Sequence, residues 1–236
     1  MSQPTSSPFL IFATKKYHAT RRIKMHTSER TLKTYHLDID VRLKKSGQFD
    51  FPIIKPCGFI PERIIPFNVA KTSKDYSAGI HFFIDDYQFE RIWRNPNAYL
   101  PRLSKFSCIF TPDFSLYLDM PYPMKIWNVY RNRLIGAWMQ KCGLNVIPTV
   151  SWSDCQSFDY CFEGLPKHST LAVSSMECKG TVNSHRWNIG MHEMISALAP
   201  NQLLIYGHKV DYDFNGINVI YYESYIRNRF KEYERQ

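Results

Sequence analysis

Short apolar runs alternate with helical segments from residue 78 onwards, and this alternation restricts the fold more than any other feature. Six runs are apolar along most of their length: residues 78–85, 107–113, 144–152, 169–177, 202–207 and 217–224. Strands with no polar face are typical of a parallel sheet buried between helices. The pattern therefore predicts successive βαβ units.

The handedness of βαβ crossovers limits how such units can assemble. They can form an open wound sheet, or a sheet that curls without closing. A complete eight-stranded barrel needs more strand–helix units than this chain contains. We therefore predict an α/β fold with a mostly parallel open sheet or an incomplete (β/α) barrel.

Helical spacing is clearest in residues 123–143, where Val129, Leu134 and Trp138 recur on one face. Pro123 near the start and Gly143 at the end are typical of helix boundaries. Residues 86–106 and 186–201 also predict helical segments. Residues 225–236 predict a polar C-terminal helix.

The N-terminal third has a different pattern. Residues 1–8 are rich in Ser, Thr and Pro and predict a disordered tail. Residues 9–77 are expected to form a basic, β-rich segment that ends in a proline-punctuated extended connection at 51–77. Within it, alternating apolar residues at 35–43 predict a half-buried strand in a hairpin. Residues 78–236 are expected to form the α/β domain.

Acidic and other functional side chains follow the predicted strands. Ligands bind outside the carboxyl ends of parallel strands, so these side chains are expected to converge. They are Asp85, Asp86, Asp113, Trp152, Asp154, Ser174, Ser175, Glu177, Gly207, His208 and Glu223.

Two kinds of chemistry fit such a rim. Asp113 and Asp86 could hold a divalent cation such as Mg²⁺. Alternatively, two carboxylates could act as acid and base. We predict Asp113, Asp86 and Glu177 as catalytic residues. The predicted substrate-binding residues are Trp152, Arg131, Ser174 and His208.

Each candidate also has a structural interpretation. An Asp before a helix is a common N-cap, and Asp85, Asp119 and Asp154 fit that role. Asp113 is the strongest functional candidate because Pro112 already fixes the turn. Arg131 and Arg133 are expected on the polar side of the 123–143 helix, where Arg131 could bind phosphate.

Positive charge is concentrated at the N-terminus. Residues 1–58 contain 11 Lys or Arg and 4 Asp or Glu, whereas the remaining residues are nearly neutral. Such a segment attracts polyanions. The predicted nucleic-acid-binding residues are Lys15, Lys16, Arg21, Arg22 and Lys24. A solvated arm without a ligand is the alternative.

The sequence predicts neither a transmembrane helix nor a secretory signal. No apolar run approaches the ~20 residues that a membrane span needs. The charges near the N-terminus follow the apolar patch at 9–13, whereas in a secretory signal they precede it. Six cysteines without a CxxC pair predict free thiols and no zinc site. We expect a cytoplasmic protein with no membrane partner.

Four stretches resemble a family of phage, plasmid and integrative-element proteins known only as a domain of unknown function. They are IHFFIDDYQFERIWRNP (80–96), FTPDFSLYLDMP (110–121), IWNVYRNRLIGAWMQKCGLNVIPTVSW (126–152) and GLPKHSTLAVSS (164–175). The resemblance covers roughly residues 50–225. It implies a mobile genetic element and a bacterial cytoplasm, and it implies no activity.

Three functions remain open from the sequence. The first is an enzyme that acts on nucleotides or nucleic acid through the strand-end acids. The second is a non-enzymatic DNA- or RNA-binding accessory of replication or transfer. The third is an inhibitor that binds a host protein, for example a defence protein.

Overall fold

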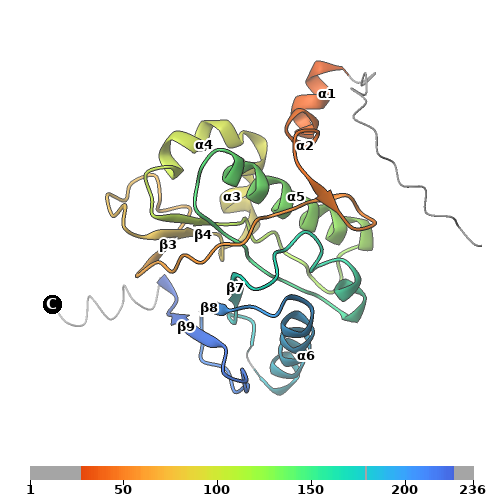
Figure 1. Cartoon of the computed structure of the whole chain (residues 1–236), viewed down its shortest axis with the longest axis vertical. Coiled ribbons are helices and arrows are strands. Elements are labelled where there is room, and N and C mark those ends of the chain that lie inside the picture. Colours follow the sequence, from red (N-terminus) through yellow and green to blue (C-terminus); the bar gives the residue numbers. More distant parts are fainter. Residues whose placement is uncertain (1–27, 179, 226–236) are drawn as a thin grey trace, which may run out of the picture.

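The computed structural model describes residues 28–178 and 180–225, and its fold is α/β (Figure 1). Seven parallel strands follow one another in chain order: β3 (Ile64–Pro66), β4 (Gly79–His81), β5 (Cys108–Phe110), β6 (Val146–Ile147), β7 (Thr170–Ser174), β8 (Gln202–Tyr206) and β9 (Asn218–Tyr222). One ladder runs from β3 to β6 and a second from β7 to β9. A parallel bridge between Thr149 and Ala172 connects the two ladders. The predicted mostly parallel open sheet is confirmed.

Side chains alternate between the two faces of the sheet, and both faces are buried. One face carries a single cluster: Cys108, Phe110, Ile147, Ala172, Leu204, Tyr206 and Tyr222. The other face packs against helices through Ile80, Ile109 and Val146 in the first ladder and Leu171, Val173 and Leu203 in the second. This two-sided burial explains why the strands read as apolar runs.

The sheet is curled, and side chains of distant strands meet on its concave face. His81 on β4 contacts Tyr206 on β8, with ring centroids 4.4 Å apart. The Tyr222 hydroxyl on β9 donates a hydrogen bond to the carbonyl of Pro61, ahead of β3. Within the described residues no ladder joins β3 to β9, so the curled sheet stays open.

Four helices lie on the convex face: α3 (Asp86–Arg94), α4 (Pro96–Leu103), α5 (Tyr122–Lys141) and α6 (Thr181–Leu198) (Figure 1). They confirm the helices expected at 86–106, 123–143 and 186–201, although α6 begins earlier than predicted. Gly143 follows α5 with φ of 87°, a conformation that only glycine adopts without strain. A short 3₁₀ helix, η1 (Cys155–Asp159), lies between β6 and β7.

The strand predicted at 35–43 is wrong. Two short helices occupy this region, α1 (Glu29–Thr34) and α2 (Leu37–Asp40), separated by His36 with φ of 53°. The His36 ring hydrogen-bonds to the carbonyl of Trp93, and Ile39 packs into the core beneath α3 and α5. These tertiary contacts outweigh a short alternating pattern, because β propensity depends strongly on context.

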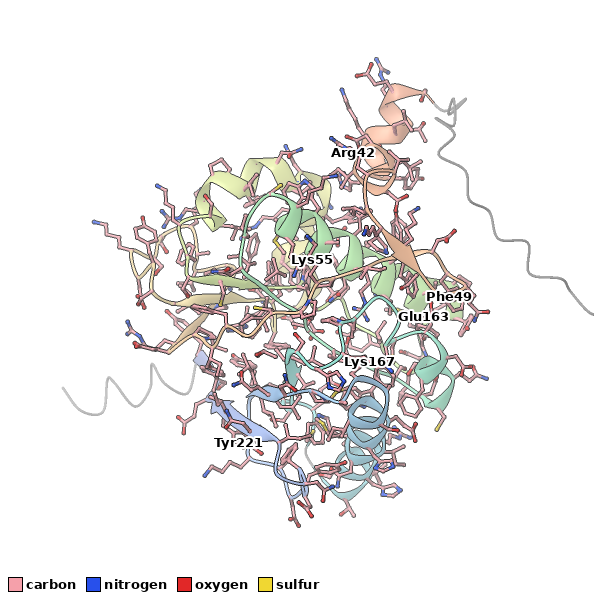
Figure 2. The ribbon with its side chains drawn as sticks, viewed as in Figure 1. Arg42, Phe49, Lys55, Glu163, Lys167 and Tyr221 are labelled. Carbon is pink, nitrogen blue, oxygen red and sulfur yellow. The ribbon has the colours of Figure 1, made fainter. Side chains whose placement is uncertain are left out.

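An antiparallel hairpin does form, but later in the chain. It pairs β1 (Lys45–Ser46) with β2 (Phe51–Pro52) and turns at Gly47, where φ is 72°. The Phe49 ring contacts Tyr160, and the Glu163 carboxylate lies against Gly47 (Figure 2). The hairpin thus packs on the segment between η1 and β7.

The proline-rich connection at 51–77 also contributes β3, the edge strand of the first ladder. Pro66 ends this strand, and an edge position tolerates a proline because one side of the strand has no partner. The predicted tail at 1–8, the cationic residues at 15–24 and the helix predicted at 225–236 lie, apart from residue 225, outside the described residues. No helix in the described part of the chain is long and apolar enough to span a membrane.

Candidate functional site

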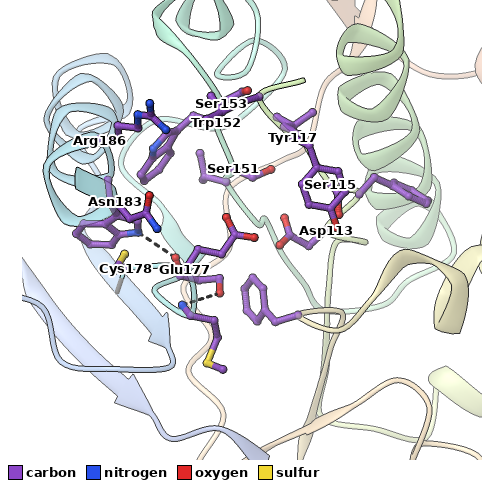
Figure 3. A pocket seen from close by; sticks show the side chains of 18 of the residues that line it. Asp113, Ser115, Tyr117, Ser151, Trp152, Ser153, Glu177, Cys178, Asn183 and Arg186 are labelled. Carbon is purple, nitrogen blue, oxygen red and sulfur yellow. Dashed lines mark hydrogen bonds between the residues drawn. The ribbon is translucent and has the colours of Figure 1, made fainter. Parts of the chain in front are cut away.

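A cavity of about 560 Å³ lies at the carboxyl ends of the strands (Figure 3). Its walls come from the segments that follow β4, β5, β6 and β7, together with the first half of α6. Among the predicted site residues, Asp113, Trp152, Ser174 and Glu177 line it. This is the place where ligands bind in parallel α/β sheets.

The position of Asp113 is fixed by a buried polar network at the end of β5. The side-chain amide of Asn132 on α5 donates to the Pro112 carbonyl at 2.8 Å and to the Thr149 hydroxyl at 2.9 Å. The backbone N–H of Thr149 donates to the Thr111 hydroxyl at 2.8 Å. These contacts tie β5, β6 and α5 together directly before Asp113, so its side chain enters the cavity from a rigid support.

The Asp113 carboxyl has one oxygen, Oδ1, that is buried and lacks a hydrogen-bond partner among the described residues. Its pKa is raised to about 7, mainly by burial and then by the charges of Asp86 and Glu177, against the opposing effects of the Ser151 hydroxyl and Arg133. The Glu177 carboxylate faces Asp113 across the cavity (Figure 3). Two carboxyl groups in this arrangement can share proton-transfer roles.

Asp86 lies behind this pair and does not line the cavity. Both of its carboxylate oxygens accept from the Ser115 backbone N–H at 3.2 Å, and Oδ1 also accepts from the Ser115 hydroxyl at 2.8 Å. Burial raises the pKa of Asp86, while the hydrogen bonds from Ser115 lower it. Asp86 therefore anchors the loop that carries Asp113.

Arg131 and Arg133 are buried, so the expectation that they lie on a polar face of α5 is wrong. Arg131 forms an ion pair with Glu90 at 2.8 Å, donates to Asn128 at 2.6 Å and stacks over the Phe114 ring at 3.7 Å. Since α5 is covered on nearly every side, its arginines pack inside the fold. Arg131 supports the loop and does not line the cavity.

The opposite wall comes from β7 and α6. Trp187 donates from its indole N–H to the Ser174 carbonyl at 2.9 Å, which ties α6 to the end of β7. Trp152 lies flat against α6 at Gly190, where a Cβ atom would be only 2.1 Å from the indole nitrogen. Gly190 therefore allows an indole ring to form part of the cavity wall (Figure 3).

Asn183 and Arg186 on α6 also line the cavity, and the sequence reasoning missed them. They lie before Trp187 and Gly190 on one helical face, at the spacing of three and four residues that brings side chains together. This helical spacing can be recognised in the sequence, but the rule that ligands bind at the carboxyl ends of parallel strands does not select residues on a helix. Tyr117 and Ser151 line the cavity from two loops, and the sequence reasoning missed them as well.

Other predicted residues lie elsewhere. His208 does not line the cavity; its carbonyl accepts from the Ser175 hydroxyl at 2.7 Å. Asp154 forms an ion pair with Lys125 at 2.7 Å and caps η1, as its structural interpretation proposed. The predicted nucleic-acid-binding residues, from Lys15 to Lys24, are outside the described residues.

The predicted divalent-cation site of Asp86 and Asp113 has little support from the geometry. The oxygens of Asp86 are already occupied by Ser115. In residues 28–178 and 180–225, no three His, Cys, Asp or Glu side chains are grouped closely enough to hold a metal ion.

Comparison with known proteins identifies relatives of this chain. Residues 43–223 match the family model described as "Domain of unknown function (DUF4417)". "Gene 1 protein" of Mycobacterium phage L5 is 37% identical over 195 residues, covering 80% of this chain and 84% of the relative. "Gene 1 protein" of Mycobacterium phage D29 is 35% identical over 203 residues, covering 83% and 74%. No solved structure matches the chain.

Proposed function

We propose that this chain, which belongs to the DUF4417 family, is an enzyme that acts on nucleotides or nucleic acid. Asp113 and Glu177 are its acid–base pair. The observation that carries this proposal is the pair of carboxyl groups that face each other in the strand-end cavity (Figure 3).

The two carboxyl groups differ in their surroundings, which suits different roles. With a pKa raised to about 7, Asp113 holds its proton in a good part of the molecules near neutral pH and can donate it. Its Oδ1 atom is buried and has no hydrogen-bond partner among the described residues, so a proton on this carboxyl is not held by another protein group at that oxygen. Glu177 then supplies the second carboxylate.

The walls of the cavity support a nucleotide as the ligand. Trp152 lines the cavity with an indole ring held on Gly190, and base rings stack on such surfaces. Arg186 lines the same wall and has no ion-pair partner within the described residues. It can pair with a phosphate group.

A thermal-shift experiment tests this function. We expect a nucleoside, a nucleotide or a short oligonucleotide to raise the Tm of the wild-type protein, because a ligand that binds only the native state stabilises it. The ligand-induced rise in Tm should be smaller in Asp113→Asn than in wild type. It should equal the wild-type rise in Asp159→Asn, a matched control at an exposed acid outside the cavity. Equal shifts in both variants, or no shift with any ligand, would contradict the proposal.

The second candidate is a non-enzymatic nucleic-acid-binding accessory. It is supported by the concentration of Lys and Arg in residues 1–58. Binding through this segment should weaken steeply with salt, because phosphate contacts release counterions. Affinity that falls with salt and is unaffected by Asp113→Asn would favour this candidate over the enzyme.

A further inference from the structure

The charge balance of the cavity narrows the class of reaction. The described residues that line it include four acidic residues, Asp85, Asp113, Asp119 and Glu177, and one positively charged residue, Arg186. Acyl and phosphoryl transfer develop negative charge and need several positive groups or N–H donors around it. An acidic cavity instead stabilises a transition state that develops positive charge.

We propose that the reaction in this cavity is hydrolysis of the N-glycosidic bond of a nucleoside or a nucleoside monophosphate. The inference rests on the proposed function, and it names the substrate class and the bond for that same site. Glycosidic cleavage passes through a cationic, oxocarbenium-like transition state, and two carboxyl groups are the usual means of catalysing it.

The step balances with the groups that the cavity supplies. Asp113 gives its carboxyl proton to a basic ring nitrogen of the base while the bond between C1′ and the glycosidic nitrogen breaks, and the bonding electrons leave with the base. The Glu177 carboxylate stabilises the positive charge on the sugar. A water molecule then adds to C1′ and gives a proton to the Glu177 carboxylate, and transfer of this proton to the facing Asp113 carboxylate restores both groups.

The other walls can hold the remaining parts of such a substrate. The indole of Trp152 provides a stacking surface for the base. Ser151 and Asn183 line the cavity and can hydrogen-bond to the sugar hydroxyls. Arg186 provides one positive group, which suits a single phosphate.

The size and charge of the cavity favour a small substrate over a strand. About 560 Å³ lies within the range of ~300–1,000 Å³ that small-molecule sites occupy. A strand carries a phosphate at every nucleotide, and four acids beside one Arg186 would repel such a polyanion. A nucleoside monophosphate places only one phosphate in this field.

The experiment measures base release by chromatography from nucleosides, nucleoside monophosphates and a short single strand. Asp113→Asn and Glu177→Gln should each lower kcat at least ~100-fold, as expected when an acid or base is lost. Glu193→Gln, an exposed position on α6 outside the cavity, should keep wild-type kcat. Thermal melts confirm that each variant is folded.

Arg186→Gln gives a second test that does not depend on the carboxyl pair. It should raise KM about tenfold for a nucleoside monophosphate, the loss expected for one charged hydrogen bond, and leave KM for the nucleoside unchanged. An equal change for both substrates would contradict the assignment of Arg186 to the phosphate.

The possible results distinguish failure of this inference from failure of the proposed function on which it rests. Nucleotide binding without any base release overturns the inference and leaves the proposed function standing. Absence of binding overturns both. Faster release from the strand than from the monophosphate overturns the choice of a small substrate.

Discussion

The two walls of the cavity differ in how fully their polar groups are paired. Behind the wall that follows β4 and β5, Asp86, Ser115, Asn128 and Arg131 are joined in one chain of hydrogen bonds that ends at Glu90, and only Ser115 of these lines the cavity. On the wall formed by β7 and α6, Glu177, Asn183 and Arg186 line the cavity. The described residues offer these three side chains no hydrogen bond or ion pair. Polar side chains that are paired with one another stabilise the fold. Unpaired polar side chains at a cavity can bind a ligand, so polar and charged residues have a structural role on one side and can have a binding role on the other.

Breaking the paired wall should have the largest effect on stability. Arg131→Met should lower the free energy of unfolding by about 3 kcal/mol, because it leaves Glu90 and Asn128 without their partner. Urea denaturation measures the loss. Arg94→Met, an exposed position on α3, is the control and should change stability by less than ~0.5 kcal/mol. Equal losses in the two variants would mean that the Arg131 network adds no stability.

Asp113 follows β5 and faces Glu177 across the cavity, and its ionisation should make the stability of the protein depend on pH. Its pKa is raised from 3.8 to about 7 in the folded protein, so its ionisation destabilises the fold progressively from pH 4 to pH 7, and fully above pH 7. Asp113→Asn should therefore be more stable than wild type by about 2 kcal/mol at pH 8. That figure is below the ~4 kcal/mol of the full shift because the side chain is only half-buried.

Denaturation at pH 4 and pH 8 checks the Asp113 prediction. The difference between mutant and wild type should nearly vanish at pH 4, where both side chains are mostly neutral. A difference that is the same at both pH values would show that Asp113 does not carry this pH dependence.

The unpaired wall should be sensitive to shape. Gly190→Ala places a methyl group 2.1 Å from the Trp152 indole nitrogen and must displace that ring. We expect a loss of about 1 kcal/mol, since overpacking outweighs the gain in helix propensity. A shift in tryptophan fluorescence should accompany it. Ser196→Ala, on the exposed face of α6, should cause neither change.

The smallest effect should come from an unpaired charge. Arg186→Gln should change the free energy of unfolding by less than ~0.5 kcal/mol, because its guanidinium is exposed and holds no other part of the fold in place. Thermal denaturation checks this. A loss above ~1 kcal/mol would mean that Arg186 supports the structure, and the contrast between the walls would weaken.

The sequence predicts the parallel α/β sheet well because burial on both faces leaves a clear signal in each strand. It fails at residues 35–43, where α2 follows a left-handed His36 and packs through Ile39. It also fails to reveal β3, because the prolines around this strand are typical of an extended connection.

The same contrast holds for the site. Asp113 and Glu177 are predictable because the chain direction of a parallel strand fixes which end carries the ligand. The role of Asp86 is not predictable, since only the folded loop brings Ser115 to its carboxylate. Arg131 is misjudged because helical periodicity assumes one solvent face, and α5 is buried nearly all round.

The chain-order arrangement of β3 to β9 has a consequence for protein synthesis. Each strand pairs with the one made just before it, so the ladders can grow as the nascent chain leaves the ribosome. The core on the concave face cannot form in this stepwise way, because His81 contacts Tyr206 and Pro61 contacts Tyr222, and both tyrosines are synthesised much later. Asp113 likewise emerges before Glu177 and α6. A nascent chain can therefore form the proposed Asp113–Glu177 pair and its cavity only after β7 and α6 have been made.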